Sequence, residues 1–251
     1  MENRNTRWRT ACLLILVSAS CTVVREDRTD CPCFLYVSLA ALPEESVEVR
    51  VCAEELCFQE SVDRDTTLRV PVPRGRVSVA AISGAEWDAE SQVRIPPGSD
   101  CPAVFLAAQQ VAADRDTVRC RLRLHKHFCT LSLRFEGPPG WGEPYSVRIR
   151  GTVGGLSAEG RPLEGAFFFQ LPAGERCRLP RQTAGDALWL DIVMPEGVLR
   201  SFALGTYLDA AGYDWTETDL KDAALRIDLS VTAVRFTIGL WSTTVPLDIV
   251  I

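Results

Sequence analysis

The sequence has 251 residues, of which 47% are hydrophobic and 24% charged, and its formal net charge is −6. This composition is typical of a globular protein and excludes an intrinsically disordered chain. The only concentrated basic stretch is RCRLRLHKH, so we expect no nucleic-acid partner.

The first twenty residues have the pattern of a secretory signal peptide. Three arginines precede a short apolar run and three small residues: Arg4, Arg7, Arg9, then 11–17 and 18–20. The apolar run is far shorter than the roughly 20 residues that a membrane-spanning helix needs. Cys21 follows directly, as in a bacterial lipobox, and we expect it to carry the lipid once residues 1–20 are removed. The alternative is an ordinary signal peptide with an incidental Cys21, since Ser18 stands where a lipobox usually has leucine.

Residues 21–33 are therefore predicted to be a lipidated cysteine and a tether. A cysteine that carries several acyl chains holds a protein stably at a membrane. The remaining cysteines of an exported chain suggest disulfides, although counting alone does not give their pairing. Only Cys52 and Cys57 are predicted to pair, because VEVRVCAEELCFQE reads as two strands around a turn. Opposed Cβ atoms lie about 4.5–5.5 Å apart in such a hairpin, which is near disulfide geometry.

Alternation of apolar and polar residues recurs along the whole chain and predicts β-strands. The predicted strands are 35–39, 47–52, 56–59, 68–72, 76–79, 118–124, 129–135, 147–149, 167–169, 188–192, 227–231, 234–238 and 245–249. Turn sequences such as PRG, GPPGWGEP and PAGE separate them. Many short strands with such turns indicate an all-β sandwich or barrel.

Two stretches are candidates for helix. Residues 103–113 are the better candidate, although they fit the cover of a sheet edge equally well. A helical turn is also predicted within residues 216–222, where Thr216 or Thr218 would serve as the N-cap.

The alternation changes phase between residues 125 and 128. Apolar residues occupy even positions up to Leu124 and odd positions from Cys129. A one-residue slip turns every side chain to the other face of a sheet, so a bulge or a domain junction must lie here. We place the junction near residue 124, which gives two domains, 34–124 and 125–251. The segment EGPPGWGEP is the competing junction.

Metal and enzyme chemistry have little support in the sequence. His125 and His127 would share one face of a strand, but the cysteine spacings lack the paired knuckles of zinc sites. The sequence contains no GxSxG, HExxH or P-loop motif. We therefore expect no metal, no cofactor and no enzymatic activity.

Three stretches, in order along the chain, resemble FimB-like fimbrial anchor and minor-subunit lipoproteins of anaerobic Gram-negative bacteria. They are the leader followed by VREDRTDCPCFLYV, the segment LRVPVPRGRVSVAA, and GTYLDAAGYDWTETDLKDAALRIDL followed by VRFTIGLW. The resemblance implies two tandem transthyretin-like antiparallel β-sandwich domains. It also implies a role in type V pilus assembly, as an anchor or a minor, including tip, subunit. The lipid would hold the protein at the outer membrane, exposed on the cell surface.

Fimbrial subunits of this kind assemble by strand addition, in which a strand of one chain completes the sheet of another. The candidate partner strand is the C-terminal one, with Val245, Leu247, Ile249 and Ile251 on one face. Pro246 has no N–H and favours an edge position. Alternatively, this is the last strand of the second domain's own sheet. The expected partners are other fimbrial subunits, the outer membrane through the lipid, and a ligand on a host or bacterial surface.

A surface glycan-binding lipoprotein without a pilus role is the second hypothesis. Such a protein should gather exposed aromatic residues on one face formed by loops. Trp87, Trp141 and Trp215 lie in turn-like contexts and are the candidates for that face.

Overall fold

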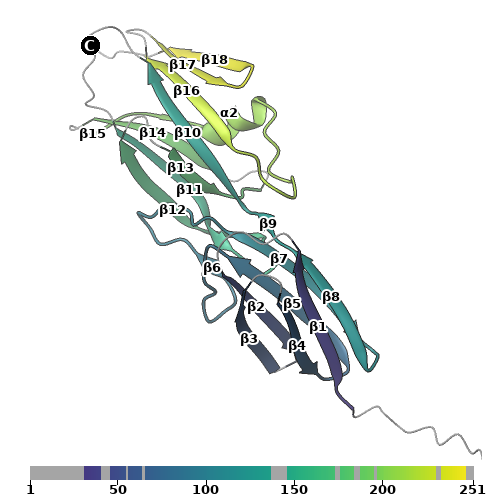
Figure 1. The fold of residues 1–251 in the computed structure, drawn as a ribbon. Coiled ribbons are helices and arrows are strands. Elements are labelled where there is room, and N and C mark those ends of the chain that lie inside the picture. The colour runs from purple at the N-terminus through teal and green to yellow at the C-terminus, as the bar shows by residue number, and fades with distance from the viewer. Residues whose placement is uncertain are drawn as a thin grey trace, which may run out of the picture.

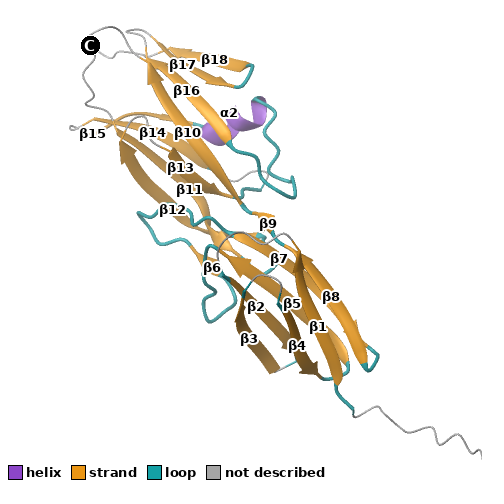
Figure 2. Ribbon diagram, in the orientation of Figure 1, coloured by secondary structure: helices purple, strands orange, loops and turns teal. Residues whose placement is uncertain are grey.

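The computed structural model shows two β-sandwiches placed end to end in an elongated body (Figure 1, Figure 2). It describes residues 31–40, 46–54, 56–63, 66–136, 146–172, 176–183, 187–194, 197–229 and 233–246. The prediction of an all-β sandwich fold is confirmed. Within these ranges no helix has the length and apolar character that crossing a membrane requires.

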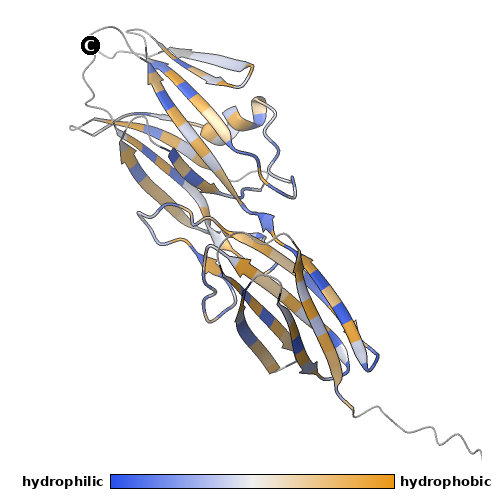
Figure 3. Cartoon of the chain, viewed as in Figure 1, coloured by the Kyte–Doolittle hydropathy of each residue, from blue (hydrophilic) through white to orange (hydrophobic). Residues whose placement is uncertain are grey.

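The first sandwich packs a sheet of strand order β4–β1–β8 against a sheet of order β3–β2–β5–β7–β9. Its strands are β1 (Cys33–Ala40), β2 (Val47–Ala53), β3 (Leu56–Val62), β4 (Thr67–Val72), β5 (Gly75–Ser83), β7 (Phe105–Ala113), β8 (Thr117–Arg123) and β9 (His125–Lys126). Buried residues alternate with more exposed ones along β2 and β4, as the period of two predicts. Figure 3 shows this alternation as changing hydropathy along the strands.

The second sandwich packs a sheet of order β13–β10–β16–β17–β18 against one of order β12–β11–β14–β15. Its elements are β10 (Phe128–Glu136), β11 (Ser146–Leu156), β12 (Pro162–Pro172), β13 (Arg176–Pro180), β14 (Leu188–Met194), β15 (Gly197–Phe202), α2 (Leu204–Ala210), β16 (Ala223–Leu229), β17 (Ala233–Ile238) and β18 (Trp241–Pro246). The short strand β6 (Val93–Arg94) comes from the segment between β5 and β7 and pairs with the end of β11.

Two of the four sheets also contain a parallel pair, in addition to the antiparallel pairing that the family resemblance implies. β1 pairs in parallel with β8, and β10 pairs in parallel with β16. In each sandwich the first strand lies between an antiparallel neighbour and a strand that arrives much later in the sequence. A parallel neighbour needs a long connection, and here the intervening strands, which include the opposite sheet, supply it.

Both helix predictions were wrong. Residues 105–113 form β7, which pairs with β5 along its whole length and buries Leu106, Ala107 and Val111. Tertiary pairing overrides the helix propensity of its alanines. Near residue 216 the carboxylate of Asp214 accepts the backbone N–H of Thr216 at 2.8 Å, which makes a turn instead of a helix.

The phase change at residues 125–128 marks the passage from one sandwich to the other. Lys126 pairs with Phe105 of β7 in the first sandwich, and Phe128 begins β10 in the second. One buried cluster spans residues 33–124, and the larger second cluster spans 95–238. The segment between β5 and β7 therefore contributes Ile95 and Cys101 to the second core.

Candidate partner-binding edges and the domain junction

The two ends of the described chain lie at opposite poles of the molecule (Figure 1). β1 begins at one pole, where Cys31 is exposed and Cys33 is buried. The hairpin β17–β18 lies at the other pole. The predicted lipidation site, Cys21, lies outside the described residues. A tether that precedes Cys31 would therefore enter the protein at the pole far from the last described strand.

β18 is the edge strand of its sheet and pairs only with β17 in the described part of the chain. The backbone of Val245 lies opposite Val234, and that of Pro246 opposite Ala233. Leu247, Ile249 and Ile251, which complete the predicted partner strand, lie outside the described residues. An edge strand presents unpaired backbone groups to which another strand can add.

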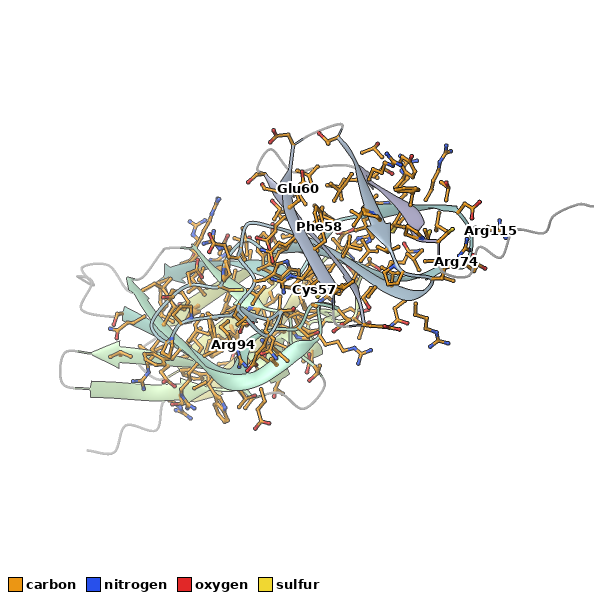
Figure 4. All side chains as sticks on the ribbon, turned by 90° about the horizontal axis from the view of Figure 1, so that it is seen from below. Cys57, Phe58, Glu60, Arg74, Arg94 and Arg115 are labelled. Atoms are coloured by element: carbon orange, nitrogen blue, oxygen red, sulfur yellow. A yellow bond between two sulfur atoms is a disulfide. The ribbon has the colours of Figure 1, made fainter. Side chains whose placement is uncertain are left out.

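A second exposed edge lies in the first sandwich, on β3 (Figure 4). Leu56 and Phe58 lie opposite Ala53 and Val51, which face the core, yet they are 68% and 40% exposed. The opposing sheet has only three strands and does not reach over β3. The sequence showed the apolar alternation of this strand, but not that the other sheet would be too narrow to cover it.

The predicted disulfide between Cys52 and Cys57 is present and joins β2 to β3. The two residues are directly opposed in the hairpin register. Glu54 adopts a positive φ of 51° in the tight turn between the strands. The bridge therefore fixes the exposed strand β3 to the rest of its sheet on the face turned away from the core.

A cluster of polar contacts around Arg181, which is only 9% exposed, holds the crossover between the two sandwiches against the second one. Its guanidinium donates to the carbonyl oxygens of Trp215 at 2.6 Å and Glu217 at 2.8 Å. It also donates to the carbonyl oxygens of Thr218 and Lys126 and to Nδ1 of His127. A buried arginine can make so many bonds because it carries five N–H donors. Arg181 thus connects the strand crossover to the loop that follows α2.

Two aspartates support the same junction. Asp219 accepts the backbone N–H of Lys126 at 2.9 Å, and this bond, with the contact to His125, holds its pKa below the ordinary value. Burial raises the pKa of Asp222, but the bonds from Lys126 and Thr130 outweigh that effect and lower it. Both carboxylates are therefore ionised at neutral pH and hold the crossover strand in place.

His127 lies inside this junction, where it accepts from Nε of Arg181. Burial and the neighbouring Arg181 lower its pKa to about 4, so the ring is neutral at physiological pH. Its ring also packs against Gly160, where a Cβ would lie within 2.3 Å of it. Among the described residues, no group of three His, Cys, Asp or Glu side chains is placed to hold a metal ion.

The three tryptophans considered for a glycan-binding loop face do not form one among the described residues. Trp215 is only 9% exposed and packs against Tyr213 at 4.6 Å between ring centroids. Trp87 is half-buried, with the guanidinium of Arg50 over its ring. Trp141 lies outside the described residues. Exposed aromatic side chains lie instead on the sheets, at Phe168, which is 44% exposed, and at Phe58 of β3.

No protein-family model matches the chain, and no curated protein matches it either. Several solved structures share its fold. The fimbrial anchor protein Mfa2 from Porphyromonas gingivalis aligns over 84% of this chain and 99% of its own, with a TM-score of 0.64 and 12% identity. A candidate polysaccharide-binding protein from Bacteroides thetaiotaomicron aligns over 85% and 98%, with a TM-score of 0.64 and 13% identity.

A candidate adhesin from Bacteroides ovatus is also similar, over 88% of this chain and 97% of its own, with a TM-score of 0.61 and 14% identity. These alignments include both sandwiches, because each covers most of both chains. The resemblance to FimB-like fimbrial proteins inferred from the sequence is thus confirmed at the level of the fold. The chain therefore shares its two-sandwich architecture with a solved fimbrial anchor and with candidate adhesins of Bacteroides.

Proposed function

We propose that this protein is a lipid-anchored fimbrial anchor or minor subunit of the FimB-like family, held at the outer membrane of a cell that builds type V pili. The observation that carries this proposal is the elongated two-sandwich body whose described ends lie at opposite poles. One pole receives the chain from the proposed lipid at Cys21. The other carries an edge strand that a pilus subunit can extend.

The domain division follows the same reasoning. Residues 1–20 are the signal peptide, 21–33 the lipidated cysteine and tether, and 34–124 and 125–251 the two transthyretin-like sandwiches. The tether sets the distance between the membrane and the first sandwich. The contacts around Arg181 keep the second sandwich pointed away from the membrane, where other fimbrial subunits and surface ligands are within reach.

The C-terminal strand is the proposed subunit interface. β18 ends at Pro246, which donates no N–H, and Val245, Leu247, Ile249 and Ile251 alternate along the segment. Addition of a partner strand would satisfy edge backbone groups and place alternate side chains in pockets. This role is structural, and it requires neither a cofactor nor an enzymatic activity.

The first test is Cys21→Ala in the cell, with membrane fractionation and electron microscopy of the surface. We expect the variant to leave the outer membrane and fimbriae to be shed or abnormally long. Cys31→Ala is the matched control, because it removes an exposed cysteine ten residues further along the tether. A variant that stays in the membrane with normal fimbriae would contradict the anchoring role.

The second test removes residues 247–251 and leaves β18 in place. The shortened protein should still reach the outer membrane but no longer co-purify with fimbrial subunits of the same cell. Unchanged co-purification would move the interface away from the C-terminal strand, and the exposed edge β3 would then be the next surface to mutate.

A further inference from the structure

The outer face of the second sandwich carries a row of three side chains that the fimbrial role does not explain. Arg150 of β11 lies directly opposite Phe168 of β12 on one side and Trp189 of β14 on the other. Directly opposed residues point to the same face of a sheet. Neighbouring residues on these strands, such as Ile149 and Leu190, are fully buried, so the row faces outward. Two aromatic rings thus flank one guanidinium, about 10 Å apart across three strands.

Beside this row the surface is hollowed. Small residues lie next to the row: Gly151 and Thr152 on β11, Ala166 on β12 and Ala187 just before β14. The hollow has a volume of about 500 Å³ and is lined by them together with the aromatic row. Ligand sites typically measure about 300–1,000 Å³, and this hollow would accept one or two sugar rings.

The charge of the hollow is positive. Asp191, whose side chain is fully buried, accepts from Nε of Arg148 at 2.9 Å and from Nε of Arg150 at 3.1 Å. Burial raises the pKa of Asp191, but the bonds from Ser201, Arg148 and Arg150 outweigh it and lower the pKa. One carboxylate therefore faces two guanidinium groups, and one positive charge remains.

Both arginines are held in place yet still reach solvent. Their side chains are 36% and 42% exposed, and each guanidinium has five N–H donors. The bonds to Asp191 use two donors of Arg148 and one of Arg150. The guanidinium of Arg150 also lies over the Trp189 ring, 5.1 Å from its centroid, which fixes the aromatic side chain as well. A site whose side chains are positioned in advance loses less entropy when it binds a ligand.

We propose that this face binds a carboxylate-bearing sugar, a uronic or sialic acid unit of a surface glycan. The carboxylate would accept the outward N–H groups of Arg150, in the charge-assisted geometry that arginine favours. The apolar faces of the sugar ring would pack against Phe168 and Trp189. An isolated small anion would use the guanidinium but would leave both aromatic walls empty. The proposal does not rest on the fimbrial role, and failure of one would leave the other standing.

The test is titration calorimetry on the full mature chain with two matched pairs of probes. They are sialyllactose against lactose, and trigalacturonic acid against its methyl ester. We expect one acidic probe to bind about tenfold more tightly than its neutral counterpart, as the loss of a hydrogen bond to a charged group predicts. Arg150→Gln should abolish this preference, and Phe168→Ala should weaken binding of acidic and neutral forms alike.

Arg119→Gln is the control, because it removes an exposed arginine from the outer face of the first sandwich. Thermal unfolding of each variant separates lost binding from lost folding, and Phe168→Ala changes a side chain that is already largely exposed. The proposal is overturned if neither acidic probe binds. It is equally overturned if inorganic phosphate displaces the acidic probe at similar concentration, since the site would then recognise charge alone.

Discussion

In both sandwiches the first strand lies between an antiparallel neighbour and a parallel one: β1 between β4 and β8, and β10 between β13 and β16. In both, the second strand crosses to the opposite sheet and pairs with the third. The sheet that contains β1 ends at β8, whereas the matching sheet of the second sandwich continues from β16 into the hairpin β17–β18. The same strand plan therefore ends at the edge strand β8 in the first domain and is extended by a hairpin in the second.

The cores differ in the size of their side chains. The buried cluster of the first sandwich consists of valine, leucine, alanine and cysteine. The second cluster contains five phenylalanines and a tryptophan: Phe128, Phe167, Phe169, Phe202, Phe236 and Trp215. A core of small side chains buries less apolar area per residue, so it contributes less to stability. Two sandwiches with the same strand plan are therefore stabilised differently: the first has a disulfide, and the second has a core of larger side chains.

The largest expected effect comes from Phe236→Ala in the second core. Phe236 is fully buried and lies 4.7 Å from Phe202 and 5.0 Å from Tyr207 between ring centroids. Its truncation should lower the free energy of unfolding by about 3–5 kcal/mol. The matched change in the first core, Val49→Ala, removes two methyl groups and should cost about 2 kcal/mol.

Urea unfolding followed by tryptophan fluorescence measures both variants. The comparison between the cores predicts that Phe236→Ala lowers the urea midpoint of the second sandwich by more than Val49→Ala lowers that of the first. Equal losses from the two variants would show that side-chain volume does not set the difference between the domains.

The junction is the next place to separate the two sandwiches. Arg181→Ala leaves the carbonyl oxygens of Trp215, Glu217 and Thr218 without their donor. We expect a loss of about 3 kcal/mol, because unpaired buried polar groups cost about 1–3 kcal/mol each and water can reach some of them. The midpoint of the second sandwich should fall, because the acceptors that lose their donor belong to it, while the first sandwich stays near its parent midpoint.

Arg181→Lys is the control for charge. Lysine keeps the positive charge but lacks the planar fork of donors, so it should restore only part of the stability. If both sandwiches keep their parent midpoints in Arg181→Ala, the junction is held by other contacts, such as the pairing of β6 with β11.

Features that depend on residues close together in the chain could be predicted from the sequence. The bridge between Cys52 and Cys57 needs only one hairpin, and the phase change at residues 125–128 is visible in a single strand pattern. The position of Pro246 in an edge strand also follows from its missing N–H. The strand at 105–113 was missed because alanine and glutamine favour helix, and only pairing with β5 decides otherwise.

Strand pairings and surfaces that depend on segments far apart in the chain could not be predicted from the sequence. The parallel pair β1–β8 joins segments that are brought together only by the sandwich between them. The row of Phe168, Arg150 and Trp189 requires the register of three strands at once. For the same reason the shared strand plan of the two domains leaves no repeat in the sequence, since different side chains satisfy the same pairing.

A smaller effect is expected from removing the disulfide. Replacing Cys52 and Cys57 together by alanine frees a short loop, and the loop-closure entropy predicts a loss of about 2 kcal/mol. The loss should be confined to the first sandwich, with the second unfolding at its parent midpoint. Reduction of the parent protein with dithiothreitol is the matched measurement, and a fall in the stability of both sandwiches would contradict the division of roles between disulfide and core.

The smallest expected effect is a pH dependence at the junction. The pKa of His127 is about 4 in the folded protein and about 6.5 in an unfolded chain, so between these values the unfolded state binds more protons. Stability is therefore fully present above pH 6.5 and falls as the pH is lowered, by about 1.5 kcal/mol between pH 6.5 and 5. The groups that face the ring are Arg181, His125 and Asp219.

Urea unfolding at a series of pH values tests this prediction. His127→Gln removes the titrating ring and should flatten the curve in this window, whereas His125→Gln leaves His127 buried and should keep the slope. The first domain alone has no such buried histidine among its described residues, so the pH dependence should appear in the unfolding of the second sandwich. If the stability of His127→Gln still falls with pH in this window, another group takes up the proton and the junction is not the source of the pH dependence.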